Sequence, residues 1–353
     1  MSLSRNTYLK VDTDIIKNNV KKIIKKYNNY KYYIGVVKAN CYGCDNESLD
    51  VTKAIIDGGC NYLAVATLQE AIIIRKKIKD IPILVLGHID SNFLQEAKDN
   101  EITVTIHSLE YAKELAKHKV MELKAHIKID TGMNRLGIAN QEELKQIINI
   151  CEKNMIKIEG IYTHIYNAED ENDYAKQIQE FEEIIKILDL NKIPIIHISA
   201  SEALVKYDKP KYVNGCRPGI IIYGFSNDKD LKLESPIKLI SEVIQIHTLK
   251  AGETVGYNGK YRAEKETKIA VVSIGYADGI IKANEGRFVY IHDKKYRIVG
   301  NICMDMLFIE IDDNVRLHDE VYILKDNKHI EEIAKYLNTI PYEILTQLKM
   351  VRS

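Results

Sequence analysis

The sequence Tyr33-Ile34-Gly35-Val36-Val37-Lys38 places a lysine directly after five apolar residues. A short, continuous apolar run of this kind is typical of a strand that is buried on both faces. At the carboxyl end of such a strand, partial burial lowers the basicity of a lysine amine and makes it a nucleophile toward carbonyl groups. A lysine whose stem packs while its amine reaches solvent is the alternative, and it is the commoner situation for a lone lysine.

Seven similar apolar runs follow the first one within residues 1–225. They occupy residues 62–66, 82–86, 102–106, 124–129, 156–163, 194–199 and 212–216. Amphipathic helical stretches separate them, for example residues 46–57, 67–78, 108–116, 141–153 and 170–188. Eight strands that alternate with helices predict an α/β fold, a (β/α)8 TIM barrel. A doubly wound sheet is the alternative, although no Gly-x-Gly-x-x-Gly follows the first strand.

The pattern changes after about residue 230. Short, β-branched runs now follow one another at residues 236–248, 268–274, 288–292, 296–302, 307–311 and 320–324. Helical patterns at 329–337 and 341–349 close the chain. We therefore expect a barrel domain at residues 1–230 and a mostly β domain at 231–353, with residues 1–12 as candidates for pairing with the β domain.

The composition of the chain argues against nucleic-acid binding and against a membrane protein. Lys+Arg and Asp+Glu both number 50, so no basic field would attract nucleic acid. No apolar run approaches the roughly 18 residues of a membrane span, and the start of the chain, Met1 to Asn6, lacks the apolar core of a signal peptide. A cytoplasmic protein is expected. The six cysteines are scattered and predict reduced thiols, and the Cys41–Cys44 pair alone does not predict a metal site.

Six ordered motifs resemble those of the bacterial alanine racemases, a family that uses pyridoxal 5'-phosphate. The motifs are Val37-Lys38-Ala39-Asn40-Cys41-Tyr42-Gly43, Lys128 to Gly137, Thr163-His164, Arg217-Pro218-Gly219-Ile220, Ile274 to Gly279, and Val299 to Asp305. The resemblance implies the interconversion of L- and D-alanine, and a role in D-alanine supply for cell-wall precursors. It implies that Lys38 carries the cofactor.

Several further residues would bind the cofactor. The strand count alone puts Lys38, Arg135, His164, Ser201 and Arg217 at the carboxyl ends of strands, the rim where barrels carry their catalytic groups. Ser201 and the backbone of Gly219 and Ile220 suit a phosphate group, although serine and glycine are also ordinary turn residues. The resemblance adds the hydroxyl of Tyr42 and the side chain of His164.

Arg217 resembles the arginine that this family places at the ring nitrogen of the cofactor. Arginine can only donate hydrogen bonds, so the ring nitrogen must stay unprotonated. A weaker electron sink results, which disfavours transamination. His197 resembles the residue that supports this arginine. A surface salt bridge for Arg217 and a buried structural histidine at 197 are the alternatives.

Tyr276 resembles the second acid/base group of the family. Lys38 would act on the D-face of the substrate and Tyr276, from the other subunit, on the L-face, so catalysis implies a homodimer. As a base, a tyrosine needs nearby positive charge or hydrogen-bond donors, and His164 is the expected neighbour. With 22 tyrosines in the chain, ordinary packing is the alternative for any one of them.

The remaining site residues also come from the resemblance. Arg135 would position the cofactor and the substrate carboxylate, and Met304 would supply a backbone donor. Asp305 would orient the Met304 loop. Lys128 matches a position that is carbamylated in some members, and a solvent-facing strand lysine is the alternative.

The match departs from the family pattern in three places. The tail tyrosine of the family has no counterpart before the chain stops at Val351-Arg352-Ser353. Cys41 stands where alanine is usual, and Ala200 where asparagine is usual. A serine or broad-specificity racemase is therefore the alternative within this fold. The sequence also leaves open a non-catalytic pyridoxal phosphate carrier, a basic-amino-acid decarboxylase and a cofactor-free barrel.

Overall fold

A computed structural model describes residues 5–348 of the chain. The predicted end of the last helix at residue 349, the start Met1 to Ser4, and Val351-Arg352-Ser353 lie outside the described residues. The described chain forms two compact units: residues 14–41 with 45–234, and residues 5–13 with 42–44 and 235–348. The division between residues 234 and 235 lies four residues beyond the expected boundary at 230.

The first unit contains eight parallel strands that close into a barrel, as predicted. The strands are β2 (Tyr32–Val36), β3 (Tyr62–Val65), β4 (Ile83–Val85), β5 (Ile102–Ile106), β6 (Lys124–Lys128), β7 (Lys157–Tyr162), β8 (Ile195–Ala200) and β9 (Gly215–Arg217). The barrel closes because the first strand pairs with the last, with Tyr32 opposite Gly215 and Tyr33 opposite Cys216. This closure excludes the doubly wound alternative.

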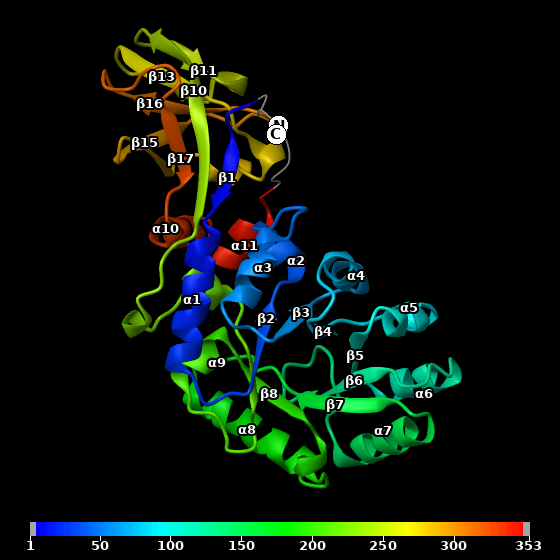
Figure 1. Ribbon diagram of the computed structural model, residues 1–353. Helices are drawn as coiled ribbons and strands as arrows, with labels where there is room; N and C mark the ends of the chain where they lie inside the picture. Colours follow the sequence, from blue (N-terminus) through cyan, green and yellow to red (C-terminus); the bar gives the residue numbers. More distant parts are fainter. Residues whose placement is uncertain (1–4, 349–353) are drawn as a thin grey trace. The chain divides into compact units, whose positions relative to one another are not determined.

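Most helices of this unit follow a barrel strand, whereas the first precedes β2 (Figure 1). They are α1 (Thr13–Lys26), α2 (Lys38–Gly43), α3 (Asp50–Asp57), α4 (Leu68–Lys77), α5 (Leu94–Asp99), α6 (Leu109–Lys117), α7 (Gln141–Lys153), α8 (Glu171–Ile185) and α9 (Ser201–Lys206). Within residues 5–348, no helix is both long and apolar enough to cross a membrane.

Polar side chains fill much of the barrel interior. The Tyr62 hydroxyl on β3 donates to Glu159 on β7 at 2.8 Å and lies 2.9 Å from the Thr103 hydroxyl on β5. These strands are not neighbours in the barrel, so the contacts cross its interior. Barrel interiors are usually filled by layers of branched aliphatic side chains. The hydrogen-bonded polar side chains inside this barrel therefore depart from the usual aliphatic packing, and hydrophobic burial alone does not account for them.

The second unit is built on a seven-stranded sheet in the order β1-β10-β13-β16-β15-β14-β17, with a further pairing between β10 and β17. Its strands are β1 (Tyr8–Val11), β10 (Ile237–Leu249), β13 (Thr267–Val272), β14 (Phe288–Ile291), β15 (Lys294–Val299), β16 (Leu307–Ile311) and β17 (Glu320–Leu324). The hairpin β11 (Thr254–Val255) with β12 (Tyr261–Arg262), and the helices α10 (Asn327–Tyr336) and α11 (Pro341–Thr346), complete it. Strand β1 pairs antiparallel with β10, with Tyr8 opposite Ile240.

Candidate functional site

Five residues expected in the site lie at the carboxyl ends of barrel strands. Lys38 follows β2 by two residues, and His164 follows β7 by two residues. Lys128 and Arg217 are the last residues of β6 and β9, while Ser201 begins α9 directly after β8. Because all eight strands run parallel in a closed barrel, their carboxyl ends share one rim.

The backbone after Lys38, which is the segment labelled α2, forms a left-handed turn. Ala39, Asn40, Cys41 and Tyr42 have φ angles of 52°, 54°, 52° and 59°. Left-handed backbone costs a non-glycine residue roughly 1–2 kcal/mol, and runs of such residues are rare. The Glu70 carboxylate, held by the capping box of α4, accepts a 2.6 Å hydrogen bond from the Ala39 N–H and so fixes the start of this turn. Strain held in this way is common at functional sites.

Two lysines at the rim have lowered pKa values. Burial and the nearby charge of Arg135 lower the pKa of Lys38, and Glu70 opposes them in part. Lys128 is only 5% exposed, and burial followed by Arg135 and Arg217 lowers its pKa to about 8. Its Nζ lies 5.8 Å from the centre of the Tyr162 ring. Both amines therefore become neutral more readily than an ordinary lysine.

Arg217 is buried and held on several sides. Its Nη1 donates to His197 Nδ1 at 2.6 Å and to the His197 carbonyl at 3.1 Å. Its Nη2 donates to the carbonyls of Thr163 and Ile198, each at 2.8 Å, and lies 3.4 Å from His164 Nδ1. Four of the five guanidinium N–H bonds thus have partners. Nε–H is the donor that has none among the described residues.

His164 is neutral at physiological pH. Burial, followed by the charges of Arg217 and Arg135, lowers its pKa to about 3. The loop that carries it is held from behind, where the Gln177 side chain donates to the His164 carbonyl at 3.2 Å and to the Thr131 hydroxyl at 2.8 Å. A neutral imidazole next to Arg217 can accept a hydrogen bond, and it adds no further positive charge to the rim.

Ser201 and Gly219 are brought together. The Ser201 hydroxyl accepts from the Gly219 N–H at 2.9 Å and from the Ile221 N–H at 3.4 Å. Ile220 begins the single 3-10 turn Ile220–Tyr223 that follows Gly219. A hydroxyl and two backbone N–H groups therefore converge where β8 and β9 end, the region of barrels that commonly holds a phosphate.

Arg135 lies on an exposed loop that folds back onto β6. Gly137 makes the return possible: its φ is 127°, and a Cβ there would lie 2.5 Å from the Asp130 nitrogen. The Asp130 N–H donates to the Ile138 carbonyl at 2.9 Å, which closes the loop. The side chain of Arg135 has no hydrogen bond or ion pair among the described residues.

The second unit carries Tyr276 and Met304. Tyr276 is 39% exposed, and its N–H donates to the Cys303 carbonyl at 3.0 Å. Met304 is 52% exposed, and its carbonyl accepts from Ala277 at 3.0 Å. Gly275 permits this contact, because a Cβ there would lie 2.4 Å from the Met304 carbonyl oxygen. The two expected site residues thus lie on two loops that are hydrogen-bonded to each other.

Arg5 ties these two loops together. Its guanidinium binds both carboxylate oxygens of Asp278, at 2.9 and 3.0 Å, and donates to the Asp305 carbonyl at 3.0 Å. Asp305 is expected from the sequence to orient the Met304 loop. In the structure the backbone carbonyl of Asp305 accepts a hydrogen bond from Arg5, which also binds Asp278 and so links the two loops. Tyr42, grouped with this unit, has its ring 5.7 Å from the ring of Tyr342.

Four residues that bear on the site were not indicated by the sequence: Glu70, Arg5, His126 and Glu159. The capping box Thr67 to Glu70 is visible in the sequence, but nothing in it indicates the hydrogen bond to Ala39. Arg5 acts on residues more than 260 positions away, so no local pattern could indicate it. Polar residues within the apolar runs of β6 and β7 were the available signal for His126 and Glu159.

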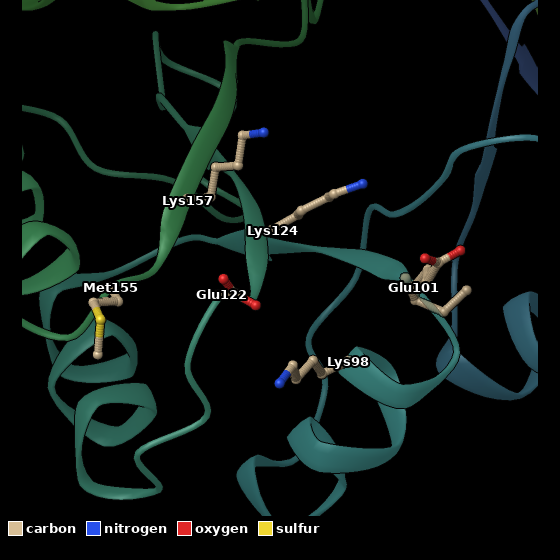
Figure 2. Close-up of a pocket in the computed structure, with 7 residues that line it drawn as sticks. Lys98, Glu101, Glu122, Lys124, Met155 and Lys157 are labelled. Carbon is tan, nitrogen blue, oxygen red and sulfur yellow. The ribbon is translucent and has the colours of Figure 1, made fainter.

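The opposite end of the barrel carries a separate hollow of about 380 Å³ (Figure 2). The first residues of three strands, Ile102, Lys124 and Lys157, contribute to its wall. Lys98, Glu101, Glu122 and Met155 complete the lining. Its charged residues form no ion pair with one another among the described residues, and none belongs to the rim that carries Lys38.

The described residues fit pyridoxal 5'-phosphate. A partly buried lysine with a lowered pKa suits covalent attachment, and the remaining N–H of Arg217 suits an aromatic nitrogen acceptor. The Ser201 hydroxyl with the Gly219 and Ile221 N–H groups suits a phosphate.

Two family models match the chain over almost its whole length. The model described as alanine racemase, N-terminal domain, matches residues 11–227. The model described as alanine racemase, C-terminal domain, matches residues 237–352.

Individual relatives agree with the family models. The chain is 34% identical to alanine racemase 1 of Bacillus subtilis over 96% of this chain and 90% of the relative. It is similar to the crystal structure of the Bacillus anthracis alanine racemase with bound L-Ala-P, with a TM-score of 0.91 and 31% identity over 99% of this chain and 94% of that one. The alanine racemase from E. faecalis gives a TM-score of 0.91 at 30% identity, over 99% and 98% of the two chains.

Proposed function

Because the chain belongs to the alanine racemase family, we propose that it interconverts L- and D-alanine with pyridoxal 5'-phosphate attached to Lys38. The observation that carries the cofactor assignment is Arg217, whose guanidinium is fixed by buried acceptors and keeps one N–H unused. The relatives named above are alanine racemases, so they do not favour a serine or broad-specificity racemase.

When bound, the cofactor withdraws electrons from the α-carbon of the substrate and so makes the α-proton acidic. Lys38 then exchanges this proton on one face of the substrate. Its lowered pKa supports the role, because it makes the neutral amine, the form that can accept a proton, more readily available than in an ordinary lysine. The like charge of Arg135 helps to keep the pKa low.

Tyr276 would exchange the proton on the opposite face, from a second copy of the chain in a homodimer. Two groups on opposite faces invert the configuration without turning the substrate. Support comes from the exposure of the Tyr276 side chain and from its backbone hydrogen bond to the Cys303 carbonyl. The link between its loop and the Met304 loop through Arg5 further supports a fixed position for the phenol.

The other residues would bind and orient. Ser201, Gly219, Ile220 and Tyr42 would hold the phosphate, with His164 as a neutral neighbour of Arg217. Arg135, which has no ion-pair partner among the described residues, would meet the substrate carboxylate together with the backbone of Met304. His197 would position Arg217.

Lys128 would carry a carbamate that pairs with Arg135. Only a neutral amine adds carbon dioxide, and the pKa of about 8 makes the neutral form of Lys128 available near physiological pH. A negative carbamate would also offset the positive charges around it. The proposed compartment for the enzyme is the cytoplasm.

The first experiment compares the racemisation of L-alanine and L-serine by the purified protein with added pyridoxal phosphate, using chiral chromatography. We expect alanine turnover to exceed serine turnover clearly. Lys38→Ala should lower it by about 10⁴-fold or more, because attachment and one acid/base group are lost together. The control is Lys113→Ala, an exposed lysine of α6. Equal or greater serine turnover would contradict the assignment to alanine.

A second experiment tests the sharing of the site. Lys38→Ala and Tyr276→Phe proteins are each purified, mixed, dissociated and reassociated. If each site combines Lys38 of one copy with Tyr276 of the other, a mixed dimer contains one intact site and regains about half of the activity per dimer. Mixtures that stay as inactive as the two parents would show that both residues act within one chain.

A further inference from the structure

We propose that Glu159 is a positioning residue for Arg217 and supplies its counter-charge through His126 and His197. The relevance to catalysis rests on the role proposed for Arg217 above, whereas the chain of contacts itself does not. The contacts run through the barrel interior from the start of β7 to the end of β9.

Three short steps connect the two ends. Arg217 Nη1 lies 2.6 Å from His197 Nδ1. His197 Nε2 lies 2.9 Å from His126 Nδ1. His126 Nε2 lies 3.6 Å from a carboxylate oxygen of Glu159. Both histidines are fully buried, so the chain is shielded from solvent along its middle.

The arginine end fixes where each proton lies. A guanidinium only donates, so His197 Nδ1 must accept and its proton must sit on Nε2. This Nε2–H then donates to His126 Nδ1, which leaves the proton of His126 on its own Nε2. The result is a chain of donors that all point from Arg217 toward Glu159.

The carboxylate end leads to the same assignment independently. His126 Nε2 is buried and has no hydrogen bond among the described residues, and the Glu159 oxygen at 3.6 Å is an electrostatic contact rather than a bond of normal length. A lone pair on Nε2 would face a negative oxygen and be repelled. A proton on Nε2 is attracted instead, so both ends require the same tautomers.

The backbone makes room for this chain. The register of β6 and β7 shifts from Ala125 opposite Ile158 to His126 opposite Gly160, which leaves Glu159 as the extra residue of a β-bulge. Bulges redirect a side chain from its regular position. A Cβ on Gly160 would lie 2.6 Å from the His126 ring, so only glycine leaves space for that ring.

The charges also fit. No carboxylate lies within ion-pair distance of Arg217 among the described residues. Burial raises the pKa of Glu159, but its contacts with His126, Tyr62 and Thr103 outweigh burial and bring the pKa to about 2. Burial lowers the pKa of both histidines, with Arg217 lowering that of His197 further. The chain therefore has a negative end, a positive end and two neutral imidazoles between them.

This arrangement has a consequence at the rim. A carboxylate placed directly on Arg217 would cancel much of its positive charge toward a bound group. A counter-charge two imidazoles away steadies the buried guanidinium by hydrogen-bond polarisation and leaves its Nε–H available. Glu159 would thus set the orientation and donor strength of Arg217 without touching the cofactor.

The test uses protein labelled with ¹⁵N in histidine and arginine and compares the wild type with Glu159→Gln, which keeps size and a hydrogen-bond acceptor but removes the charge. In the wild type we expect both histidines to be neutral with the proton on Nε2 between pH 7 and pH 9. Glu159→Gln should shift the His126, His197 and Arg217 side-chain signals, most strongly at His126. Glu152→Gln, an exposed change on α7, is the control and should shift none of them.

Two results would overturn the proposal: a proton on Nδ1 of either histidine in the wild type, or Arg217 and His197 signals that are unchanged in Glu159→Gln. Glu159→Asp restores the charge and should recover part of the wild-type signals. Kinetics add a second readout, since kcat should fall by about tenfold in Glu159→Gln with KM nearly unchanged. The spectra are informative even if the wild type does not racemise alanine, so failure of the proposed function is seen separately.

Discussion

The two ends of the barrel interior treat charge in opposite ways. At the carboxyl end, the positive charges of Lys38, Lys128 and Arg217 add to burial in lowering the pKa of His164, and those of Arg217 and Lys38 also help to lower the pKa of Lys128. None of these three cations has an ion-pair partner among the described residues. Toward the amino end, the charged group Glu159 is surrounded by three donors.

The difference shows where the fold tolerates unfavourable electrostatics. Glu159 is stabilised by its neighbours, and its charged state favours the folded chain. The rim keeps several cations close together without direct ion-pair partners among the described residues, which costs stability unless an anionic ligand is bound. Such sites, where the environment shifts pKa values strongly, are candidates for function. A phosphate and a substrate carboxylate are the groups that would relieve this repulsion.

The largest expected effect comes from adding a side chain against the ring of His126, which lies between Glu159 and Arg217 in the chain of contacts. Gly160→Ala places a methyl group 2.6 Å from the His126 ring and should lower the free energy of unfolding by about 1–3 kcal/mol. Gly215→Ala is the graded comparison, because its Cβ would lie 3.1 Å from the His197 Cβ and should cost less. Urea unfolding of both variants measures the difference. A Gly160→Ala protein as stable as the wild type would show that the ring is free to move aside.

An effect of similar size and opposite sign is expected at the rim. Because the pKa of Lys128 falls from 10.5 to about 8 on folding, the unfolded chain binds this proton more tightly, and the charged lysine destabilises the fold below pH 8. Lys128→Met should therefore raise the free energy of unfolding by about 1–3 kcal/mol at pH 7.

That gain should shrink as the pH rises from 8 to 10.5, because the lysine becomes neutral in the folded and then in the unfolded chain. Urea titrations of cofactor-free protein in carbon-dioxide-free buffer at several pH values would follow it. A gain that stays constant up to pH 10.5 would assign the effect to packing and not to charge.

The smallest effect is expected on the surface of the barrel where its strands begin. Lys157 is exposed at the hollow shown in Figure 2, so Lys157→Ala should change the free energy of unfolding by less than about 0.5 kcal/mol and leave racemisation unchanged. Thermal unfolding and the alanine assay check this. A clear loss of activity would mean that the hollow, and not only the buried carboxylate, acts on the rim.

Much of the fold was predictable because buried parallel strands are continuous apolar runs. All eight barrel strands lie within a few residues of the predicted ranges, and β10 to β17 account for the β-rich second half. Helix α1 was missed, although Ile16, Val20 and Ile23 repeat at helical spacing. Strand β1 could be named only as a candidate for pairing, because its partner β10 lies far along the chain.

The site was predictable only where chemistry follows a strand directly, as for Lys38, Lys128 and Arg217. Arg5 and Glu159 act through contacts with residues far along the chain or across the barrel, which no local pattern records. The left-handed turn at Ala39 to Tyr42 also contradicts local preference, since only one glycine, Gly43, follows it. Local rules fail most often where the structure holds strain for function.

The pairing of β1 with β10 sets a minimum time for assembly on the ribosome. Tyr8 pairs with Ile240, so the partner strand is translated 240 − 8 = 232 residues later. At a translation rate of roughly 5–20 residues per second, β1 stays unpaired for about 10 to 50 seconds while the barrel residues are synthesised. The first strand of the chain is therefore among the last to find its place, and during that interval its edge is open to chaperones and to neighbouring chains.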